Sequence, residues 1–84
     1  MTPPKHTIPL FSSTAGQWLK IISMPRGVLH AQFVRVGIGE GEKVRCLERL
    51  PGGTIIIQKN RQQIAIGHQL ARKIIVLVLG DGEK

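Results

Sequence analysis

Apolar and polar residues alternate over several short stretches of this chain, which is the pattern of half-buried β-strands. In Gln17–Met24, Leu19 and Ile21 fall on one face and Lys20 falls on the other, together with Trp18. Further strands, also rich in β-branched residues, are expected over Lys43–Leu50, Thr54–Lys59, Gln62–Ile66 and Arg72–Leu79. The pattern therefore predicts about five strands.

One stretch has helical spacing instead. The range Val28–Val36 carries an apolar stripe that includes Phe33 and predicts an α-helix. Gly37 follows at once and can adopt the left-handed conformation that ends a helix, and Gly41 can make the reversal into the next strand. A phosphate-binding glycine loop follows a strand and opens a helix, so the reversed order here favours turn chemistry.

The connections between the predicted strands are short. Pro51-Gly52-Gly53 is a turn, Asn60-Arg61 is expected to reverse the chain between two strands, and Gly67–Ala71 is expected to form one helical turn. Ile8–Phe11 is interpreted as an anchoring segment. Five short strands with one helix indicate a small, strongly bent antiparallel barrel, because closure removes exposed sheet edges. We expect one domain over residues 8–79, with flexible tails at 1–7 and 80–84.

Charge is the strongest feature of the composition. The 84 residues carry a net charge of +7, and residues 49–80 hold five lysines and arginines with no acid between them. Such a chain should attract an anionic partner: nucleic acid, an acidic protein surface or lipid headgroups. The longest uninterrupted apolar run is too short to cross a bilayer, and the first residues lack a secretory signal, so we expect a cytoplasmic protein.

The candidate reactive residues do not form a catalytic set. His6, His30 and His68 fall in a tail, a helix and a turn, so no enzyme activity is expected. Cys46 takes an inward strand position and is predicted to be a small buried apolar residue. No pair has the spacing of a structural zinc site. A weak surface metal site remains open, formed by a histidine with acids from the set Glu40, Glu42 and the C-terminal acids.

Two further interpretations concern surfaces. The chain has the positive charge that nucleic-acid binding needs but few aromatic side chains on which bases could stack. Phe33 belongs to the apolar stripe of the helix, so Trp18 is the candidate exposed ring. In Ile74–Leu79, both faces of the strand are apolar. That surplus indicates either coverage by the N-terminal segment or the helix, or a docking surface or homo-oligomer contact.

Four segments in order resemble the FeoA family, the small ferrous iron transport protein A. Gln32–Val44 is similar to its helix–glycine–turn–glycine–strand signature, and Pro51–Ile57 is similar to the turn and strand that follow. Ile64–Lys73 resembles its closing strand and short helix, and Ile8-Pro9-Leu10 with Gly16 resembles its opening. The resemblance spans about residues 8–79.

This resemblance implies an SH3-like barrel and a cytosolic accessory role in bacterial ferrous iron uptake. It implies a partner, the membrane transporter FeoB with its cytosolic GTP-hydrolysing domain, which would hold the protein peripherally at the inner membrane. It also implies binding of Fe²⁺ or another divalent transition metal, with no ligand set evident in the residues. The alternatives are a basic barrel that binds nucleic acid and a transition-metal sensor that uses His30 or His68.

The expected partner-binding residues lie in two groups. The first group is the helix end and its glycine turn, and the second is the outward face of the strand that follows. The residues are His30, Arg35, Gly37, Ile38 and Gly41 in the first group, and Arg45 and Arg49 in the second.

Overall fold

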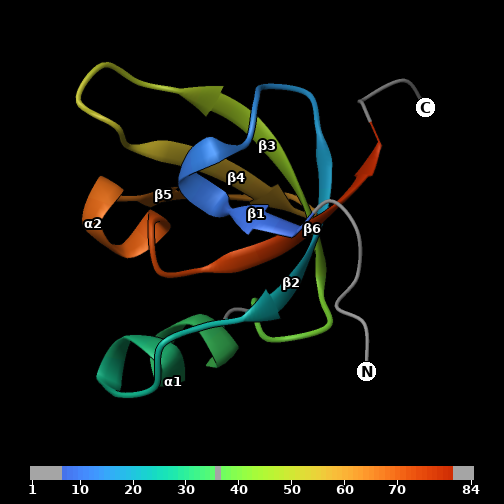
Figure 1. Ribbon diagram of the computed structural model, residues 1–84. Coiled ribbons are helices and arrows are strands. Elements are labelled where there is room, and N and C mark those ends of the chain that lie inside the picture. The colour runs from blue at the N-terminus through green and yellow to red at the C-terminus, as the bar shows by residue number, and fades with distance from the viewer. Residues whose placement is uncertain (1–6, 36, 81–84) are drawn as a thin grey trace.

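A computed structural model describes residues 7–35 and 37–80 (Figure 1). In chain order its elements are β1 (Thr7–Pro9), the 3₁₀ turn η1 (Leu10–Ser12), β2 (Trp18–Ser23), α1 (Val28–Arg35), β3 (Lys43–Arg49), β4 (Ile55–Lys59), β5 (Gln62–Ile66), α2 (His68–Ala71) and β6 (Ile75–Gly80). The predicted mainly β architecture is confirmed. The described residues form six strands rather than about five, because part of the expected anchoring segment pairs with the last strand as β1.

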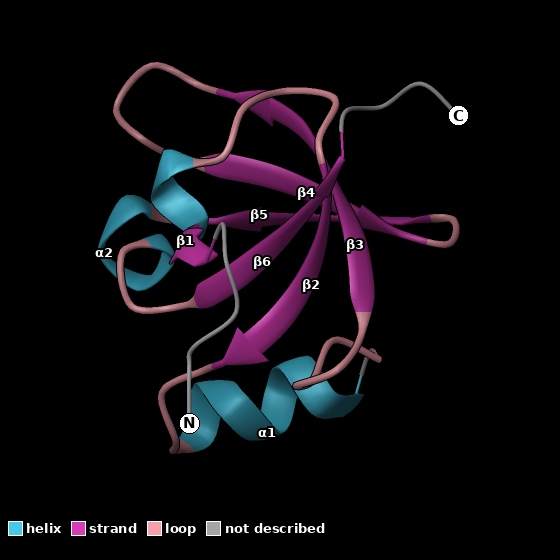
Figure 2. Ribbon diagram, turned by 45° about the vertical axis from the view of Figure 1, so that its right-hand side comes forward, coloured by secondary structure: helices cyan, strands magenta, loops and turns pink. Residues whose placement is uncertain are grey.

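All pairings in the sheet are antiparallel, in the order β1-β6-β2-β3-β4-β5. The last strand thus lies between β1 and β2, and the first half of the chain is tied directly to its end. Figure 2 shows the strongly bent sheet, with α1 beyond the end of β2 and α2 near η1. No helix in the described ranges is long and apolar enough to span a bilayer.

Strand alternation builds the core as the sequence predicts. Leu19 on β2 pairs with Val44 on β3, and both are fully buried, as is Cys46 two residues further along. The Cys46 sulfur accepts a hydrogen bond from the hydroxyl of buried Ser13 at 3.4 Å, so the thiol is a packed core group. The alternation breaks at Leu47, where a register shift between Cys46 and Glu48 marks a β-bulge.

The turns follow the predicted chemistry with shifted ends. Asn60 and Arg61 join β4 to β5, and Asn60 has a positive φ of 57°, which asparagine tolerates. The helical turn before the last strand is confirmed as α2. The last strand begins at Ile75 rather than Arg72, because the backbone N–H groups of Arg72 and Lys73 bond back to α2 carbonyls. Thr7 and Gly80, which the sequence places in the tails, belong to β1 and β6.

Candidate interaction surface

The end of α1 is a fixed structural cap. The backbone N–H of Ile38 donates to the Phe33 carbonyl at 2.8 Å, and that of Gly37 donates to the Val34 carbonyl at 3.0 Å. Gly37 has a φ of +86°. These bonds form the Schellman motif that satisfies the last carbonyls of a helix, so the predicted role of Gly37 is confirmed. The glycine-rich stretch therefore ends a helix and holds no phosphate-type loop.

Ile38 is fully buried in the hydrophobic core, with 0% of its surface exposed. A side chain without exposed surface cannot contact a partner, so the prediction of Ile38 as a contact residue is wrong. The helical cap turns the chain directly after Gly37, and the next side chain joins the buried core. Ile38 therefore anchors the turn after α1 to the core of the barrel.

The other predicted residues at the helix end differ in what they offer. Arg35 is exposed in the last turn of α1, and Gly41 has a φ of +93° and donates its N–H to the Ile21 carbonyl at 2.7 Å. Gly41 thus binds the turn to β2. His30 belongs to α1, but its side chain lies outside the described residues. Arg35 is the one charged side chain that the described helix end presents.

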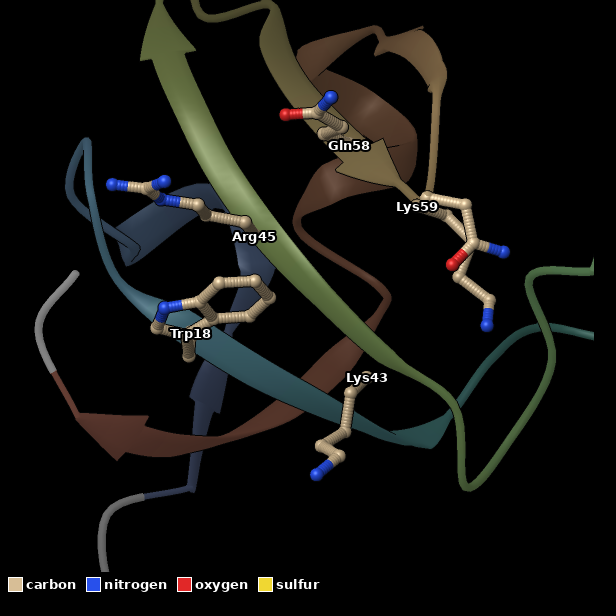
Figure 3. A pocket seen from close by; sticks show the side chains of 6 residues that line it. Trp18, Lys43, Arg45, Gln58 and Lys59 are labelled. Atoms are coloured by element: carbon tan, nitrogen blue, oxygen red, sulfur yellow. The ribbon is translucent and has the colours of Figure 1, made fainter. Parts of the chain in front are cut away.

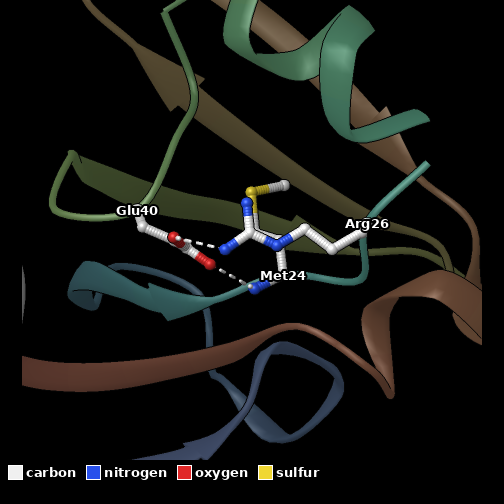
Figure 4. Close-up of polar contacts among 3 residues, drawn as sticks. All are labelled: Met24, Arg26 and Glu40. Atoms are coloured by element: carbon white, nitrogen blue, oxygen red, sulfur yellow. Dashed lines mark hydrogen bonds and ion pairs between the residues drawn. The ribbon is translucent and has the colours of Figure 1, made fainter. Parts of the chain in front are cut away.

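The two acids that follow the helix already have partners. A Glu40 oxygen accepts a hydrogen bond from the Met24 N–H at 3.3 Å, and the other lies 3.8 Å from the Arg26 guanidinium (Figure 4). Glu42 pairs with Lys59 at 2.8 Å. Within the described ranges, no three His, Cys, Asp or Glu side chains group as metal ligands. The metal site suggested for these acids stays a prediction.

A hollow of about 370 Å³ opens on the outer face of β2, β3 and β4 (Figure 3). Its lining combines one indole, three cationic side chains and two amides: Trp18, Lys43, Arg45, Gln58, Lys59 and Asn60. We call these six residues the basic hollow. None of them is acidic. Lys59 is paired with Glu42, so Lys43 and Arg45 supply the positive charge beside the aromatic ring.

Sheet register explains why these side chains meet. Trp18 lies opposite Arg45 on the neighbouring strand, and Arg45 lies opposite Gln58 on the next. The Arg45 guanidinium carbon is 5.5 Å from the indole centroid, a cation–π contact that fixes both groups. Trp18 remains 38% exposed. The prediction placed Trp18 and Arg45 outward but could not pair them, because the alternation pattern carries no information on register between strands.

Arg49 serves a different purpose. Its guanidinium donates hydrogen bonds to the backbone carbonyls of Phe11 and Ser13, the latter at 2.8 Å, and lies 5.3 Å from the Phe11 ring centroid. Arg49 therefore fastens the end of β3 to η1. The alternation pattern predicts that Arg49 faces outward but gives no sign of these bonds, because its partner Phe11 lies 38 residues earlier in the chain.

We expect Arg49→Gln to lower the free energy of unfolding by about 1–2 kcal/mol, because hydrogen bonds from a charged donor are lost at a partly exposed site. Urea unfolding would measure the change. Arg72→Gln is the matched control, since Arg72 is exposed after α2, and should change stability by less than about 0.5 kcal/mol. Equal stabilities of the two variants would contradict the role given to Arg49.

The model of the FeoA domain matches residues 9–78 of this chain. The chain belongs to the FeoA family. No curated protein matches this FeoA-domain chain significantly.

Solved structures of FeoA proteins have the same fold. An iron uptake regulatory protein (FeoA) is 30% identical, with a TM-score of 0.74 over 87% of this chain and 99% of that one. The FeoA protein from Chlorobium tepidum is 22% identical, with a TM-score of 0.79 over 92% of this chain and 74% of that one. FeoA proteins are SH3-like, so the SH3-like prediction is confirmed, and membership of the family implies a role in ferrous iron transport.

The same fold occurs in a larger protein. A manganese-dependent transcriptional repressor is 20% identical, with a TM-score of 0.79 over 94% of this chain but only 45% of the repressor. At that identity the likeness concerns the fold alone. The FeoA domain described here thus corresponds in architecture to a part of that repressor.

Proposed function

We propose that this FeoA protein is a non-enzymatic accessory protein of bacterial ferrous iron uptake, which acts in the cytoplasm by binding the cytosolic part of the FeoB transporter. The observation that supports this proposal is the basic hollow with its half-exposed indole. Tryptophan and arginine are the residues that most often dominate the binding energy of protein interfaces. A net charge of +7 would favour an acidic partner surface.

The binding residues proposed here are Trp18, Lys43 and Arg45, with Arg35 at the end of α1 as a second contact. Trp18 supplies apolar area at small entropic cost because the Arg45 guanidinium already holds its ring. Lys43 is exposed at the start of β3 and can reach an acidic group of a partner. Residues of the helix cap hold the fold and are not proposed as contacts.

We expect Trp18→Ala to weaken binding to the purified cytosolic domain of FeoB about thirtyfold, the loss typical of a central aromatic anchor. Lys43→Glu should weaken it about tenfold and mainly slow association, because rim charges steer encounter. Biolayer interferometry, in the absence of lipid, would measure both. Arg72→Glu makes the same charge change at an exposed residue after α2, outside the basic hollow, and should bind like the wild type.

Two results would overturn the proposal. A wild-type protein that does not bind the FeoB domain removes the proposed partner. Equal losses of affinity in the Lys43→Glu and Arg72→Glu variants would mean that binding depends on net charge alone and not on the basic hollow. A fluorescence titration with DNA and RNA at two salt concentrations tests the nucleic-acid alternative, for which affinity should fall steeply with salt.

A further inference from the structure

The outer face of β6, β2 and β3 changes from apolar to basic across the strands. On β6, Leu79 is 45% exposed and Leu77 is half-buried; on β3, Lys43 is exposed. On β2 between them, Lys20 lies opposite Leu77 on one side and opposite Lys43 on the other. Trp18 precedes Lys20 on the same face. We call Trp18, Lys20, Lys43, Arg45, Leu77 and Leu79 the amphipathic face.

Folding alone does not account for this face. Lys20 and Lys43 are directly opposite on adjacent strands, and like charges in that position destabilise a sheet. No acidic side chain in the described part of the chain pairs with either of them. Leu79 exposes almost half of its surface to water on the neighbouring strand. Both features are unfavourable in water, and both become favourable against a surface that is anionic and apolar at once.

We propose that the amphipathic face binds the surface of an anionic lipid bilayer. Tryptophan is enriched where headgroups meet hydrocarbon, and exposed leucines can enter that boundary. Lysine and arginine side chains beside them are attracted to anionic headgroups, each by about a factor of five in the binding constant. Leu77, Lys20 and Lys43 follow one another across β6, β2 and β3, with Trp18 beside Lys20 on β2. The exposed Leu79 lies next to them on β6, at the point where the register with β2 shifts.

Lipid fits this face better than the other anionic partners. Nucleic acid or an acidic protein surface would satisfy Lys20, Lys43 and Arg45 but would leave the exposed Leu79 without an apolar environment. A second copy of the chain would cover Leu79 but would oppose cations to cations. This site goes beyond the binding of FeoB, with which it shares Trp18, Lys43 and Arg45. Lys20, Leu77 and Leu79 belong to the amphipathic face alone.

The experiment uses the full chain with vesicles of phosphatidylcholine and phosphatidylglycerol, compared with vesicles of phosphatidylcholine alone. The chain has one tryptophan and no tyrosine, so its fluorescence reports Trp18 directly. We expect sedimentation with the anionic vesicles and a blue shift of the indole emission. Lys20→Gln should lower the partition coefficient about fivefold, and Leu79→Ser about tenfold because leucine loses its apolar environment.

Matched controls lie on other elements. Val34→Ser removes an exposed apolar side chain from α1, and Arg72→Gln removes an exposed charge after α2. Arg72→Gln should lower the partition coefficient less than Lys20→Gln does, and Val34→Ser less than Leu79→Ser. The FeoB domain, assayed without lipid, should bind Lys20→Gln and Leu79→Ser like the wild type, so failure of one proposal is distinguished from failure of the other.

Three results would overturn the lipid assignment. The first is no partition into anionic vesicles. The second is partition with equal losses in the Leu79→Ser and Val34→Ser variants, which would make it nonspecific. The third is a blue shift that depends on protein concentration without vesicles, which would assign the face to a second copy of the chain.

Discussion

The Ile38→Glu variant is expected to be largely unfolded. Ile38 is fully buried, and burial of an unpaired carboxyl group costs on the order of 5 kcal/mol. A domain of 84 residues has about 4–12 kcal/mol of stability in total. Circular dichroism and urea unfolding would measure the loss. Any loss of partner binding in this variant would follow from unfolding.

Two companion variants separate packing from surface effects. Ile38→Val removes one methyl group and should cost about 1 kcal/mol. Arg35→Glu changes an exposed residue at the same helix end and should leave the fold intact. A well-folded Ile38→Glu protein would contradict the buried position of this side chain.

Gly53→Ala is expected to destabilise the protein by about 3 kcal/mol or more. Gly53 has a φ of +97°, and a Cβ atom added there would lie 2.6 Å from the His68 Cβ and 3.0 Å from a Phe11 ring carbon. The substitution therefore combines backbone strain with a clash between the turn, η1 and α2. Thermal unfolding should show a midpoint lowered by at least about 12 °C.

The neighbouring glycine provides the control. Gly52 has nearly the same φ, +93°, but an added Cβ would meet nothing within 4 Å. Gly52→Ala should therefore cost only the strain of the left-handed conformation, about 1–2 kcal/mol. Similar midpoints for the two variants would mean that His68 and Phe11 shift to make room for the added methyl group. The clash would then not be the cause of the destabilisation.

Local patterns predicted the local structure well. The alternation around Leu19 and Val44 places their side chains in the core, and Gly37 ends α1 with the expected cap. The break in alternation at Leu47 was visible in the sequence and coincides with a β-bulge. Each of these features depends on residues within a few positions of each other, which is the range over which periodicity and turn chemistry act.

Features that depend on distant residues were missed. Thr7–Pro9 is a strand only because it pairs with β6, and Arg49 is fixed by carbonyls of η1. Its place directly after the helix predicts Ile38 as a partner contact. Whether its side chain is buried depends on the direction of the chain after the helix cap, which the sequence pattern does not give. Lys43 and Gln58 join Trp18 in one hollow only through strand register. The basic hollow follows from tertiary pairing and could not be located from spacing alone.

The place of β6 between β1 and β2 has a consequence for biosynthesis. Its two neighbours lie within residues 7–23, whereas β6 begins at Ile75. The central pairing of the sheet therefore forms only after residues 75–80 have been synthesised, and until then β1 has no partner strand in the sheet. Folding dominated by such distant pairings is slow, on the order of milliseconds to seconds. A nascent FeoA chain that stalls before residue 75 should be an early target for chaperones and proteases.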